Sequence, residues 1–376
     1  MRIGISCYAT VGGSGAVATE LGKALATRGH EVHFIVSDVP FRLGEFRNNL
    51  YIHEVETVSY PVLRTPPYDF SLAAKMADVV AEYHLDILHA HYALPFAVCA
   101  FLAKEMLGEN KVRTVTTLHG TDVTVLAQDR SLKNVMRLGI ERSDAVTAVS
   151  HSLIEETRSL FGTEKEIECI YNFVDPDIFR PQSERQTRAC LARPGERVLM
   201  HVSNFRKIKR VPDVILVFQK VLQQVDSRLI LVGEGPELTA ARDLVRQLGL
   251  QEKVNFLGKQ DEVASLFAAA DVFLLPSEKE SFGLVALESM ACGVPVVGSI
   301  AGGIPEVVKP NETGFLFPIG DVDGMANAVL RLFSDENLYH RLSVGARKTA
   351  ETQFNVAEQV AYYERIYQRL IEDASR

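Results

Sequence analysis

The sequence lacks the features of disulfide-rich, metal-binding and membrane-spanning proteins. Its five cysteines are an odd number, lie far apart and include no C-x-x-C pair, which argues against a disulfide scaffold and a zinc site. No apolar run approaches the ~18–20 residues of a membrane span, and a turn follows too early for a secretory signal. A positive balance is also absent, because the formal net charge is −8, which disfavours general nucleic-acid binding. We therefore expect a soluble, cytoplasmic protein with reduced thiols.

The length and the alternation of apolar segments indicate two α/β domains. At 376 residues the chain exceeds the ~250–300 residues at which one hydrophobic core stops growing. Short β-branched runs alternate with helix-length segments, which is typical of βαβ units and parallel sheets. The first series of predicted strands comprises residues 3–8, 32–36, 51–56, 86–92, 113–120, 144–150 and 167–172, and the second comprises 196–204, 228–235, 253–259, 271–277, 294–299 and 313–318.

A polar segment rich in turn-forming residues separates the two series and predicts the domain boundary. We place an N-terminal Rossmann-like domain at 1–172 and a C-terminal one at 173–354, each doubly wound. In the last segment, 355–376, an apolar stripe with steps of three and four predicts an amphipathic helix. This helix either packs as a plain C-terminal element or crosses back onto the N-terminal domain, to which we assign it.

A glycine-rich loop follows the first predicted strand. Gly13-x-Gly15-x-x-Ala18 fits a dinucleotide-binding fingerprint, and Asp38 lies about twenty residues on, where a ribose-binding carboxylate would be. A nicotinamide dehydrogenase would explain this pattern, but the loop is longer than the tight turn of that motif. A plain strand-to-helix turn is a further alternative. The glycines do allow close approach of a ligand to backbone amides, so we interpret the loop as an anion-binding site.

The most specific motif is ESFGLVALE, residues 280–288. It joins a predicted strand to a predicted helix, so that Glu280 precedes the helix and Glu288 lies about two turns into it. Amides at a helix N-terminus can bind a diphosphate, and a carboxylate on either side can accept hydrogen bonds from sugar hydroxyls. This arrangement fits a sugar nucleotide. A glycosidase also needs two carboxylates, and glutamates on a helix are often only solvated side chains.

Basic residues follow the first strand of the second series. Four of the five residues from Arg206 to Arg210 are basic, at the sheet edge where open α/β folds bind ligands. A nucleic-acid patch or a solvated surface would have the same composition. We select Arg206 and Lys209 for the diphosphate, because charge-assisted hydrogen bonds stabilise a departing phosphate. Closely spaced aspartates at 175–177 and 321–323 could hold a metal instead, but they lie in predicted turns, and we expect neither a metal nor a cofactor.

Nearly the whole chain resembles the retaining GT-B glycosyltransferases that carry an E-x7-E motif. The motifs that carry the resemblance follow the order of that family: the glycine loop, TLHGTD, AVTAVSHSL, SNFRKIKRV, LVGEGPE, FLGKQDEV, ESFGLVALE and GGIPEVV. The resemblance implies two Rossmann-like domains that face a central cleft. It also implies that the N-terminal domain binds the acceptor and the C-terminal domain binds the donor.

The resemblance further implies roles for single residues. Glu288 would bind the ribose of UDP, Glu280 the transferred sugar, and His119 a sugar hydroxyl. The arginine-to-lysine spacing is shorter than in the family, which leaves Lys209 and Arg210 as alternatives at the phosphate. The catalytic set is His119, Arg206, Lys209 and Glu280. The donor set is Gly13, Ser203, Asn204, Arg206, Lys209, Leu257, Gly258, Glu280, Ser281, Phe282, Gly283, Leu284 and Glu288, with the backbone of 257–259 at the uracil.

The motifs GGSG, PPYDFSLAAKMA, HAHYALP and LHGTDVTVL resemble those of family members that transfer N-acetylglucosamine from UDP to L-malate at the start of bacillithiol biosynthesis. The resemblance implies this donor, this acceptor and retention of the α-configuration. The acceptor set is Gly13, Ser14, Gly15, Tyr92, Thr117 and His119. Arg64, Lys133 and Arg137 are candidate charge partners of malate.

No side chain stands out as a covalent nucleophile. The family is thought to react on one face of the sugar, with the leaving phosphate taking the acceptor proton, so that catalysis rests on positioning and charge stabilisation. Two alternatives remain: a glycosyltransferase for another acceptor, such as an inositol phosphate or a lipid-linked sugar, and a nonenzymatic sugar-nucleotide sensor. We expect no nucleic-acid partner and no stable membrane association, since a basic amphipathic helix is lacking. A homo-oligomer remains open.

Overall fold

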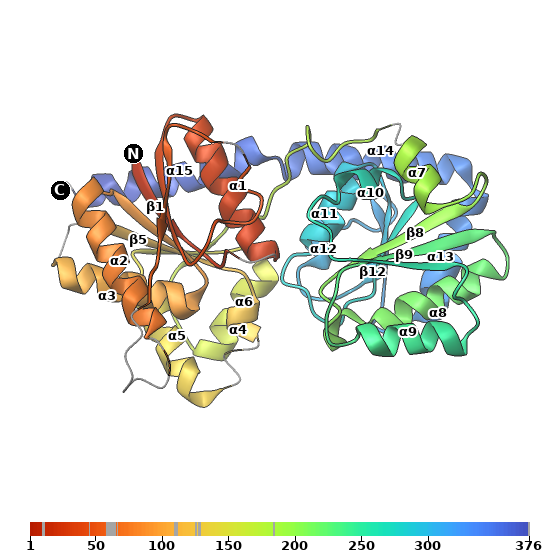
Figure 1. Cartoon of the computed structure of the whole chain (residues 1–376), viewed down its shortest axis with the longest axis horizontal. Coiled ribbons are helices and arrows are strands. Elements are labelled where there is room, and N and C mark those ends of the chain that lie inside the picture. The colour runs from red at the N-terminus through yellow and green to blue at the C-terminus, as the bar shows by residue number, and fades with distance from the viewer. Residues whose placement is uncertain are drawn as a thin grey trace. The chain divides into compact units, whose positions relative to one another are not determined.

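The computed structural model describes residues 1–9, 12–44, 46–57, 65, 67–108, 112–124, 126, 129–182 and 185–374. It divides into two units, Met1–Asn172 with Val356–Arg376, and Phe173–Asn355. Each unit is built on one parallel sheet (Figure 1). The predicted α/β class with two doubly wound sheets is thereby confirmed.

The first unit has a seven-stranded sheet in the order β3-β2-β1-β4-β5-β6-β7. Since β1 pairs with both β2 and β4, the direction in which strands are added changes between β1 and β4. Open α/β sheets bind ligands at such a switch point, beyond the carboxyl ends of the strands. The strands are β1 (Arg2–Ser6), β2 (Glu31–Val36), β3 (Leu50–Glu54), β4 (Ile87–His91), β5 (Arg113–Leu118), β6 (Ala145–Ala148) and β7 (Ile167–Cys169).

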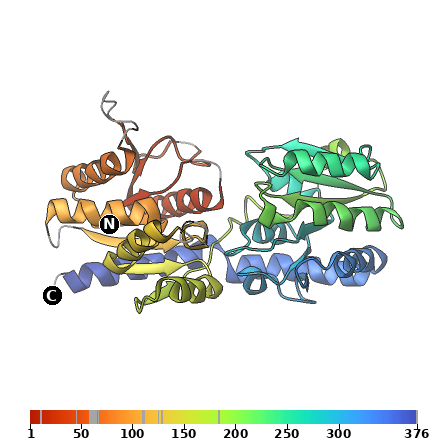
Figure 2. The ribbon, with the colours of Figure 1, turned by 90° about the horizontal axis from the view of Figure 1, so that it is seen from below.

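Helices cover both faces of this sheet (Figure 2). The helix expected near the C-terminus is α15 (Val356–Ala374), which belongs to the first unit and buries Val360, Tyr363 and Ile366. The other helices of the unit are α1 (Gly13–Thr27), α2 (Tyr68–Tyr83), α3 (Val98–Leu107), α4 (Thr121–Thr124), α5 (Arg130–Arg142) and α6 (His151–Phe161), with the π-helical turn η1 (Ala93–Ala97) before α3.

The second unit has a six-stranded sheet in the order β10-β9-β8-β11-β12-β13, with its switch point between β8 and β11. The strands are β8 (Arg197–Val202), β9 (Ser227–Val232), β10 (Val254–Gly258), β11 (Val272–Leu275), β12 (Val296–Ser299) and β13 (Gly314–Phe317). The helices are α7 (Arg185–Leu191), the 3-10 turn η3 (Lys207–Lys209), α8 (Val211–Leu222), α9 (Leu238–Gln247), α10 (Ala264–Ala268), α11 (Leu284–Ala291), α12 (Ile304–Val307), α13 (Val322–Ser334) and α14 (Glu336–Gln353).

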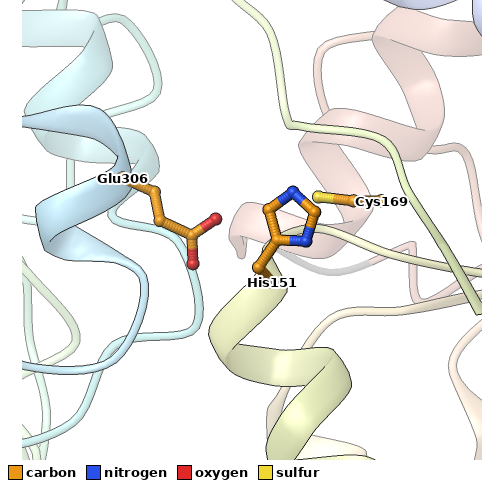
Figure 3. A group of neighbouring side chains, drawn as sticks. All are labelled: His151, Cys169 and Glu306. Carbon is orange, nitrogen blue, oxygen red and sulfur yellow. The ribbon is translucent and has the colours of Figure 1, made fainter.

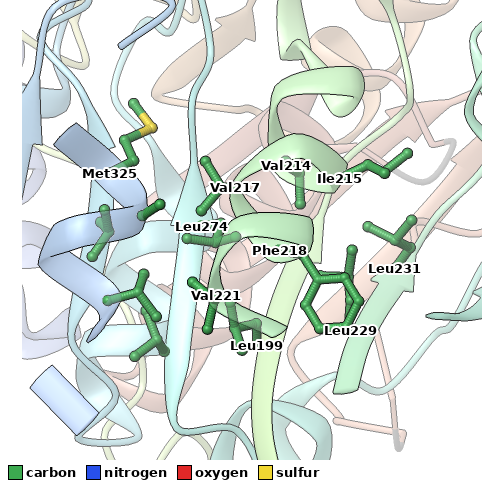
Figure 4. Close-up of a cluster of buried hydrophobic side chains, with 14 of the residues drawn as sticks. Leu199, Val214, Ile215, Val217, Phe218, Val221, Leu229, Leu231, Leu274 and Met325 are labelled. Atoms are coloured by element: carbon green, nitrogen blue, oxygen red, sulfur yellow. The ribbon is translucent and has the colours of Figure 1, made fainter. Parts of the chain in front are cut away.

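The core of the second unit lies between α8 and the sheet. Val214, Phe218 and Val221 share one stripe of α8, and they pack over Leu229 of β9 and Leu274 of β11 (Figure 4). Strands buried on both faces need continuous apolar runs, as the sequence has here. This core holds the strand ends that carry the polar loops. Among the described residues, none of the helices has the length and the apolarity needed to cross a bilayer.

Candidate active site

Two loops at the switch point of the second sheet bring Lys209 and Glu280 together. Lys209 ends η3, which follows β8, and Glu280 follows β11, the neighbouring strand. The Nζ of Lys209 lies 2.5 Å from Oε1 of Glu280, and the hydroxyl of Ser277 donates to the same oxygen at 3.0 Å. The two charged side chains are only 15% and 12% exposed. Because little water screens them, both charges can act strongly on a bound ligand.

Arg210 has a different orientation from Lys209. Its φ of 51° places it in the left-handed region. Its Nε donates to Oδ2 of Asp213 at 2.7 Å. Of the two basic residues that the sequence leaves as alternatives for the phosphate, Lys209 is therefore the one beside Glu280.

Close backbone contacts fix the loop that follows β8. A Cβ on Gly233 would lie 1.8 Å from the carbonyl oxygen of Ser203, and one on Gly235 would lie 2.0 Å from that of Asn204. Only glycine permits this approach of the loop after β9. With its amide oxygen turned toward the guanidinium, Asn204 accepts hydrogen bonds from Arg206 at 3.1 and 3.2 Å. The predicted residues of this loop thus lie together at the switch point.

His201 of β8 supports the same loop, and its role is not predicted from the sequence. Its Nδ1 lies 2.9 Å from the carbonyl oxygen of Leu274, and its Nε2 lies 2.8 Å from the hydroxyl of Ser203. Burial lowers the pKa of His201 to about 4, so the ring is neutral near pH 7. Neutral histidine can donate to the carbonyl and accept from the hydroxyl. A histidine inside an apolar strand is the sequence signal that could have identified it.

The N-terminus of α11 offers free amides beside Glu280. Gly283 precedes the helix with φ 94°, a conformation that favours glycine. Because the helix begins at Leu284, the amides without an intrahelical partner are those of Gly283, Leu284 and Val285. The predicted amide set starts at Ser281, two residues earlier, and omits Val285. Ser281 precedes the helix.

The side chains of Phe282 and Glu288 are both buried in the second unit. The ring of Phe282 packs edge-on against Phe354, with ring centroids 5.7 Å apart. Phe282 can therefore contribute only its backbone to a ligand site. Glu288 lies in α11 and is 4% exposed. Its role at the ribose remains a prediction.

The loop between β12 and α12 packs closely against the backbone of Glu280. The amide of Gly303 donates to the carbonyl oxygen of Glu280 at 2.9 Å. A Cβ on Gly302, which has φ 51°, would lie 1.9 Å from the same oxygen. These glycines hold Glu280 at the sheet edge.

The predicted uracil-binding segment lies at the same edge, at the end of β10. Gly258 has φ 66°, and its carbonyl oxygen accepts a hydrogen bond from the amide of Gly233 at 2.8 Å. Leu257 and Gly258 are thus linked to the loop that contacts Ser203. All predicted donor residues of the second unit lie on α11, at the end of β10 or beyond the carboxyl ends of β8 and β11.

In the first unit, aromatic side chains gather at the carboxyl ends of β1, β4 and β5. The ring of Tyr92 stacks on His119 with centroids 5.6 Å apart, and it meets Tyr8 edge-on at 5.3 Å. Tyr8 is 41% exposed. Tyr92 and His119 are predicted from the sequence, whereas Tyr8 is not, because only the strand order reveals that β1 lies beside β4.

Thr117 has a different environment from the one predicted for an acceptor-binding residue. It is fully buried, and its hydroxyl lies 2.7 Å from Nε2 of His89 and 2.7 Å from the hydroxyl of Thr147. His89 in turn contacts the hydroxyl of Tyr367 on α15 at 2.7 Å. The hydroxyl of Thr117 thus supports the strand ends from the interior, and the role of Thr117 in acceptor binding remains a prediction.

The glycine loop leads into α1, which begins at Gly13. The amide of Ala16 donates to the carbonyl of Gly12 at 3.0 Å, so the amides of Gly13, Ser14 and Gly15 have no intrahelical partner. These amides remain candidates for binding an anion. Gly12 has extended backbone at φ 174°, and a Cβ there would meet nothing within 4 Å, so a glycine is not required at that position.

The three candidate charge partners of malate differ in their environment. Arg64 lies outside the described residues. Arg137 of α5 is exposed, and its Nε donates to Glu141 at 2.7 Å. Lys133, one turn earlier on α5, is half-buried. Lys133 is therefore the better candidate of the two that the structure describes.

The aspartates weighed as metal ligands have local structural roles. Asp321 caps α13 through the amide of Gly324 at 2.8 Å, and Asp175 accepts from the amide of Asp177 at 2.9 Å. Elsewhere, the side chains of His151 (α6) and Cys169 (β7) lie within 4.8 Å of each other in the first unit (Figure 3).

A cavity of about 710 Å³ in the second unit lies at the opposite edge of its sheet. Arg228 and Asn255, which are at or near the amino ends of β9 and β10, line it together with residues of α7. Ligands of open α/β sheets bind at the carboxyl edge. The cavity is therefore separate from the loops described above.

Comparisons with known proteins agree with this geometry. The family model described as "Glycosyl transferases group 1" matches residues 182–349, and "Glycosyltransferase Family 4" matches residues 11–178. The chain belongs to this glycosyltransferase family, which confirms the resemblance seen in the motifs. Over 374 residues, 99% of this chain and 98% of the relative, it is 51% identical to N-acetyl-alpha-D-glucosaminyl L-malate synthase of Bacillus anthracis.

Solved structures show the same fold over nearly the whole chain. Sucrose-phosphate synthase from Thermosynechococcus elongatus matches with a TM-score of 0.81 at 24% identity, covering 99% of both chains. An Anabaena protein crystallised in complex with UDP-glucose matches with a TM-score of 0.79 at 21% identity, covering 98% of this chain and 100% of that one. At these identities the likeness concerns the fold alone.

Proposed function

We propose that this protein transfers N-acetylglucosamine from UDP-N-acetylglucosamine to the hydroxyl of L-malate, with retention of the α-configuration. The observation that carries the proposal is the 51% identity along nearly the full chain to the Bacillus anthracis L-malate synthase. The Lys209–Glu280 pair at a switch point supports a nucleotide-sugar donor. The reaction would open bacillithiol biosynthesis in the cytoplasm, and we propose that it needs no metal.

The donor would bind to the second unit through its diphosphate. The amides of Gly283 to Val285, with Arg206 and Lys209, would bind the phosphate oxygens. Because Lys209 pairs with Glu280 in this structure, a bound diphosphate would compete for its ammonium group and leave the carboxylate to accept a sugar hydroxyl. Glu288 and the backbone near Leu257 would hold the ribose and the uracil.

The acceptor would bind to the first unit. The amides of Gly13 to Gly15 would bind a carboxylate, with Tyr92 and His119 beside it and Lys133 as the cationic candidate. In the transfer step, the bond between the anomeric carbon and the diphosphate oxygen breaks, and the malate hydroxyl oxygen bonds to that carbon on the same face. The hydroxyl proton passes to the departing phosphate. Lys209 and Arg206 stabilise the negative charge that develops there.

A product screen tests the proposal. The purified protein is incubated with UDP-N-acetylglucosamine or UDP-glucose and with L-malate, D-malate or an inositol phosphate, and the products are identified by mass spectrometry. We expect a glycosylated product from UDP-N-acetylglucosamine and L-malate, with an α-anomeric proton signal in NMR. A product only with the inositol phosphate would refute the acceptor. Binding of UDP without any product would support the sensor alternative.

A further inference from the structure

The histidine at the end of β4, His91, lies directly beside His119 at the end of β5. The Nδ1 of His91 is 2.9 Å from Nε2 of His119, and the rings stack with centroids 5.1 Å apart. Strands β4 and β5 pair in register up to His91 and Thr117, which keeps the two rings adjacent. This contact occupies Nε2 of His119 and leaves Nδ1 as the ring nitrogen available to a ligand.

Both rings are neutral near pH 7. His91 is fully buried, and burial lowers the pKa of its ring well below 6.5. Burial also lowers the pKa of His119 to about 3. Two neutral imidazoles that form one hydrogen bond share a single proton along it, so one ring donates and the other accepts. The protonation of His91 therefore determines that of His119.

The second nitrogen of His91 indicates which ring is the donor. Among the described residues, Nε2 of His91 is the buried side-chain atom for which no hydrogen-bond partner is found. A buried N–H group without an acceptor is rare in native proteins. The proton of His91 is therefore better placed on Nδ1, where it donates to Nε2 of His119. His119 then carries its own proton on Nδ1.

The buried carboxylate of Asp122 holds the two strand ends in this geometry. It accepts hydrogen bonds from the amide of Ala93, after β4, at 3.0 Å, and from that of Gly120, after β5, at 2.8 Å. Asp122 is fully buried. Because these backbone bonds do not involve His91, the loops can keep their positions when the His91 side chain is replaced.

We propose that His91 is a positioning residue that fixes the tautomer of His119, so that His119 presents Nδ1–H to a substrate oxygen. In this role His119 donates a hydrogen bond to a hydroxyl or carboxylate oxygen and does not act as a base. The inference rests on the proposed function for the identity of the substrate. The tautomer itself does not depend on that identity.

Nitrogen NMR of histidine-labelled protein tests the tautomer without any turnover. His119 is assigned from the signals lost in His119→Asn. We expect a protonated Nδ1 and a bare Nε2 in the unmodified protein, and a shift toward the Nε2–H form in His91→Phe, which keeps a ring at this position. His33→Phe removes another buried histidine of the first unit and leaves the His119 signals unchanged. An Nε2–H form of His119 in the unmodified protein, or no change in His91→Phe, overturns the proposal.

Kinetics separate positioning from general loss of structure. One hydrogen bond corresponds to roughly a tenfold change, so we expect His91→Phe to lower kcat/KM about tenfold. His91→Asn, whose amide nitrogen can replace Nδ1 as a donor, restores most of the loss. In a His119→Asn background His91→Phe has no further effect. Additive losses in the double variant contradict the coupling, whereas a failed malate assay with the expected tautomer refutes only the proposed acceptor.

Discussion

Lys209 and Glu280 form an ion pair with each other in this structure. A substitution at either position therefore also removes the charge partner of the other residue. Removal of the lysine leaves a carboxylate that is 12% exposed without its cation. Part of the effect of such a variant therefore comes from Glu280 and not from the phosphate. A comparison with neighbouring basic residues is needed to separate the two.

We predict that Lys209→Met and Arg206→Ala each lower kcat about 10- to 150-fold, since one charge-assisted hydrogen bond contributes about 1.5–3 kcal/mol. Arg210→Ala is the matched control, because its guanidinium binds Asp213. We expect Arg210→Ala to retain activity within about fivefold, which corresponds to the ~0–1 kcal/mol that an ion pair of this kind contributes. Steady-state kinetics with saturating malate measure all three. Equal losses in Arg210→Ala and Lys209→Met would contradict the assignment of the phosphate to Lys209.

A second prediction concerns metal ions. The aspartates in metal-like spacing already cap α13 or close a turn, and Asp323 pairs with Lys220 at 2.9 Å. We expect turnover to be unchanged after dialysis against EDTA and not to rise with added Mg²⁺. Activity lost in EDTA and restored by Mg²⁺ would show that a metal stabilises the leaving group.

Some of these residues can be predicted from sequence and others cannot. Lys209 and Glu280 lie in short motifs that directly follow predicted strands, so their place at the ligand-binding edge of the sheet can be predicted from the sequence. The roles of Tyr8 and His91 could not be predicted, because they depend on which strands are neighbours in the sheet, and the sequence does not give the strand order. The orientation of the Arg210 side chain depends on a left-handed backbone conformation, for which the sequence has no signal at this position.

At the scale of single elements, the turn between β12 and α12 holds the backbone of Glu280 in place through close contacts. Its glycine, Gly302, has φ 51°, and a Cβ there would lie 1.9 Å from the Glu280 carbonyl oxygen. We predict that Gly302→Ala displaces Glu280, which we propose binds the transferred sugar, and weakens the binding of UDP-N-acetylglucosamine at least tenfold, as calorimetry would measure. Gly29→Ala is the control, because Gly29 also has positive φ, 88°, but a Cβ there meets nothing within 4 Å. Gly29→Ala should lower the free energy of unfolding only by the backbone strain of about 1–2 kcal/mol and leave the affinity for UDP-N-acetylglucosamine unchanged.

An unchanged affinity for UDP-N-acetylglucosamine in Gly302→Ala would show that Glu280 tolerates movement of this turn. The predicted strands and their order along the chain agree with the structure, since buried parallel strands have a clear apolar signature. The helix that follows Glu280 is predicted as well, and in the structure it is α11, which begins at Leu284. The contact of Gly303 with Glu280 is not predictable, because it joins two loops that are separate in the sequence.

For the whole molecule, the ion-pair cluster around Glu196 predicts a pH dependence of stability. Burial alone raises the pKa of Glu196, but hydrogen bonds from Lys253, the Arg193 amide and Arg228 outweigh it and lower the pKa to about 2. The folded-state pKa is thus below the ordinary 4.5, so this stabilisation is present above pH 4.5 and is lost as the pH falls toward 2.

We expect Glu196→Gln to lower the free energy of unfolding by about 2–3 kcal/mol at pH 7 and by much less near pH 2.5. Because the chain has no tryptophan, urea unfolding is followed by circular dichroism. Glu252→Gln changes an exposed carboxylate next to Lys253 and should leave the stability within about 0.5 kcal/mol. If the free energy of unfolding of Glu196→Gln differs from that of the unmodified protein by the same amount at every pH, the loss comes from packing and not from the charge of Glu196.

The chain leaves the first unit at Asn172 and returns to it only at Val356. Tyr363 and Tyr367, both fully or almost fully buried in this unit, are therefore synthesised only after the whole second unit. Until then His89 and Thr117 lack these phenolic partners, and the space that the rings fill is open. The first unit thus becomes complete only after the second unit has been translated. A fragment ending at Asn172 should therefore behave as an expanded, dye-binding intermediate that a synthetic peptide of residues 356–374 converts to the native state.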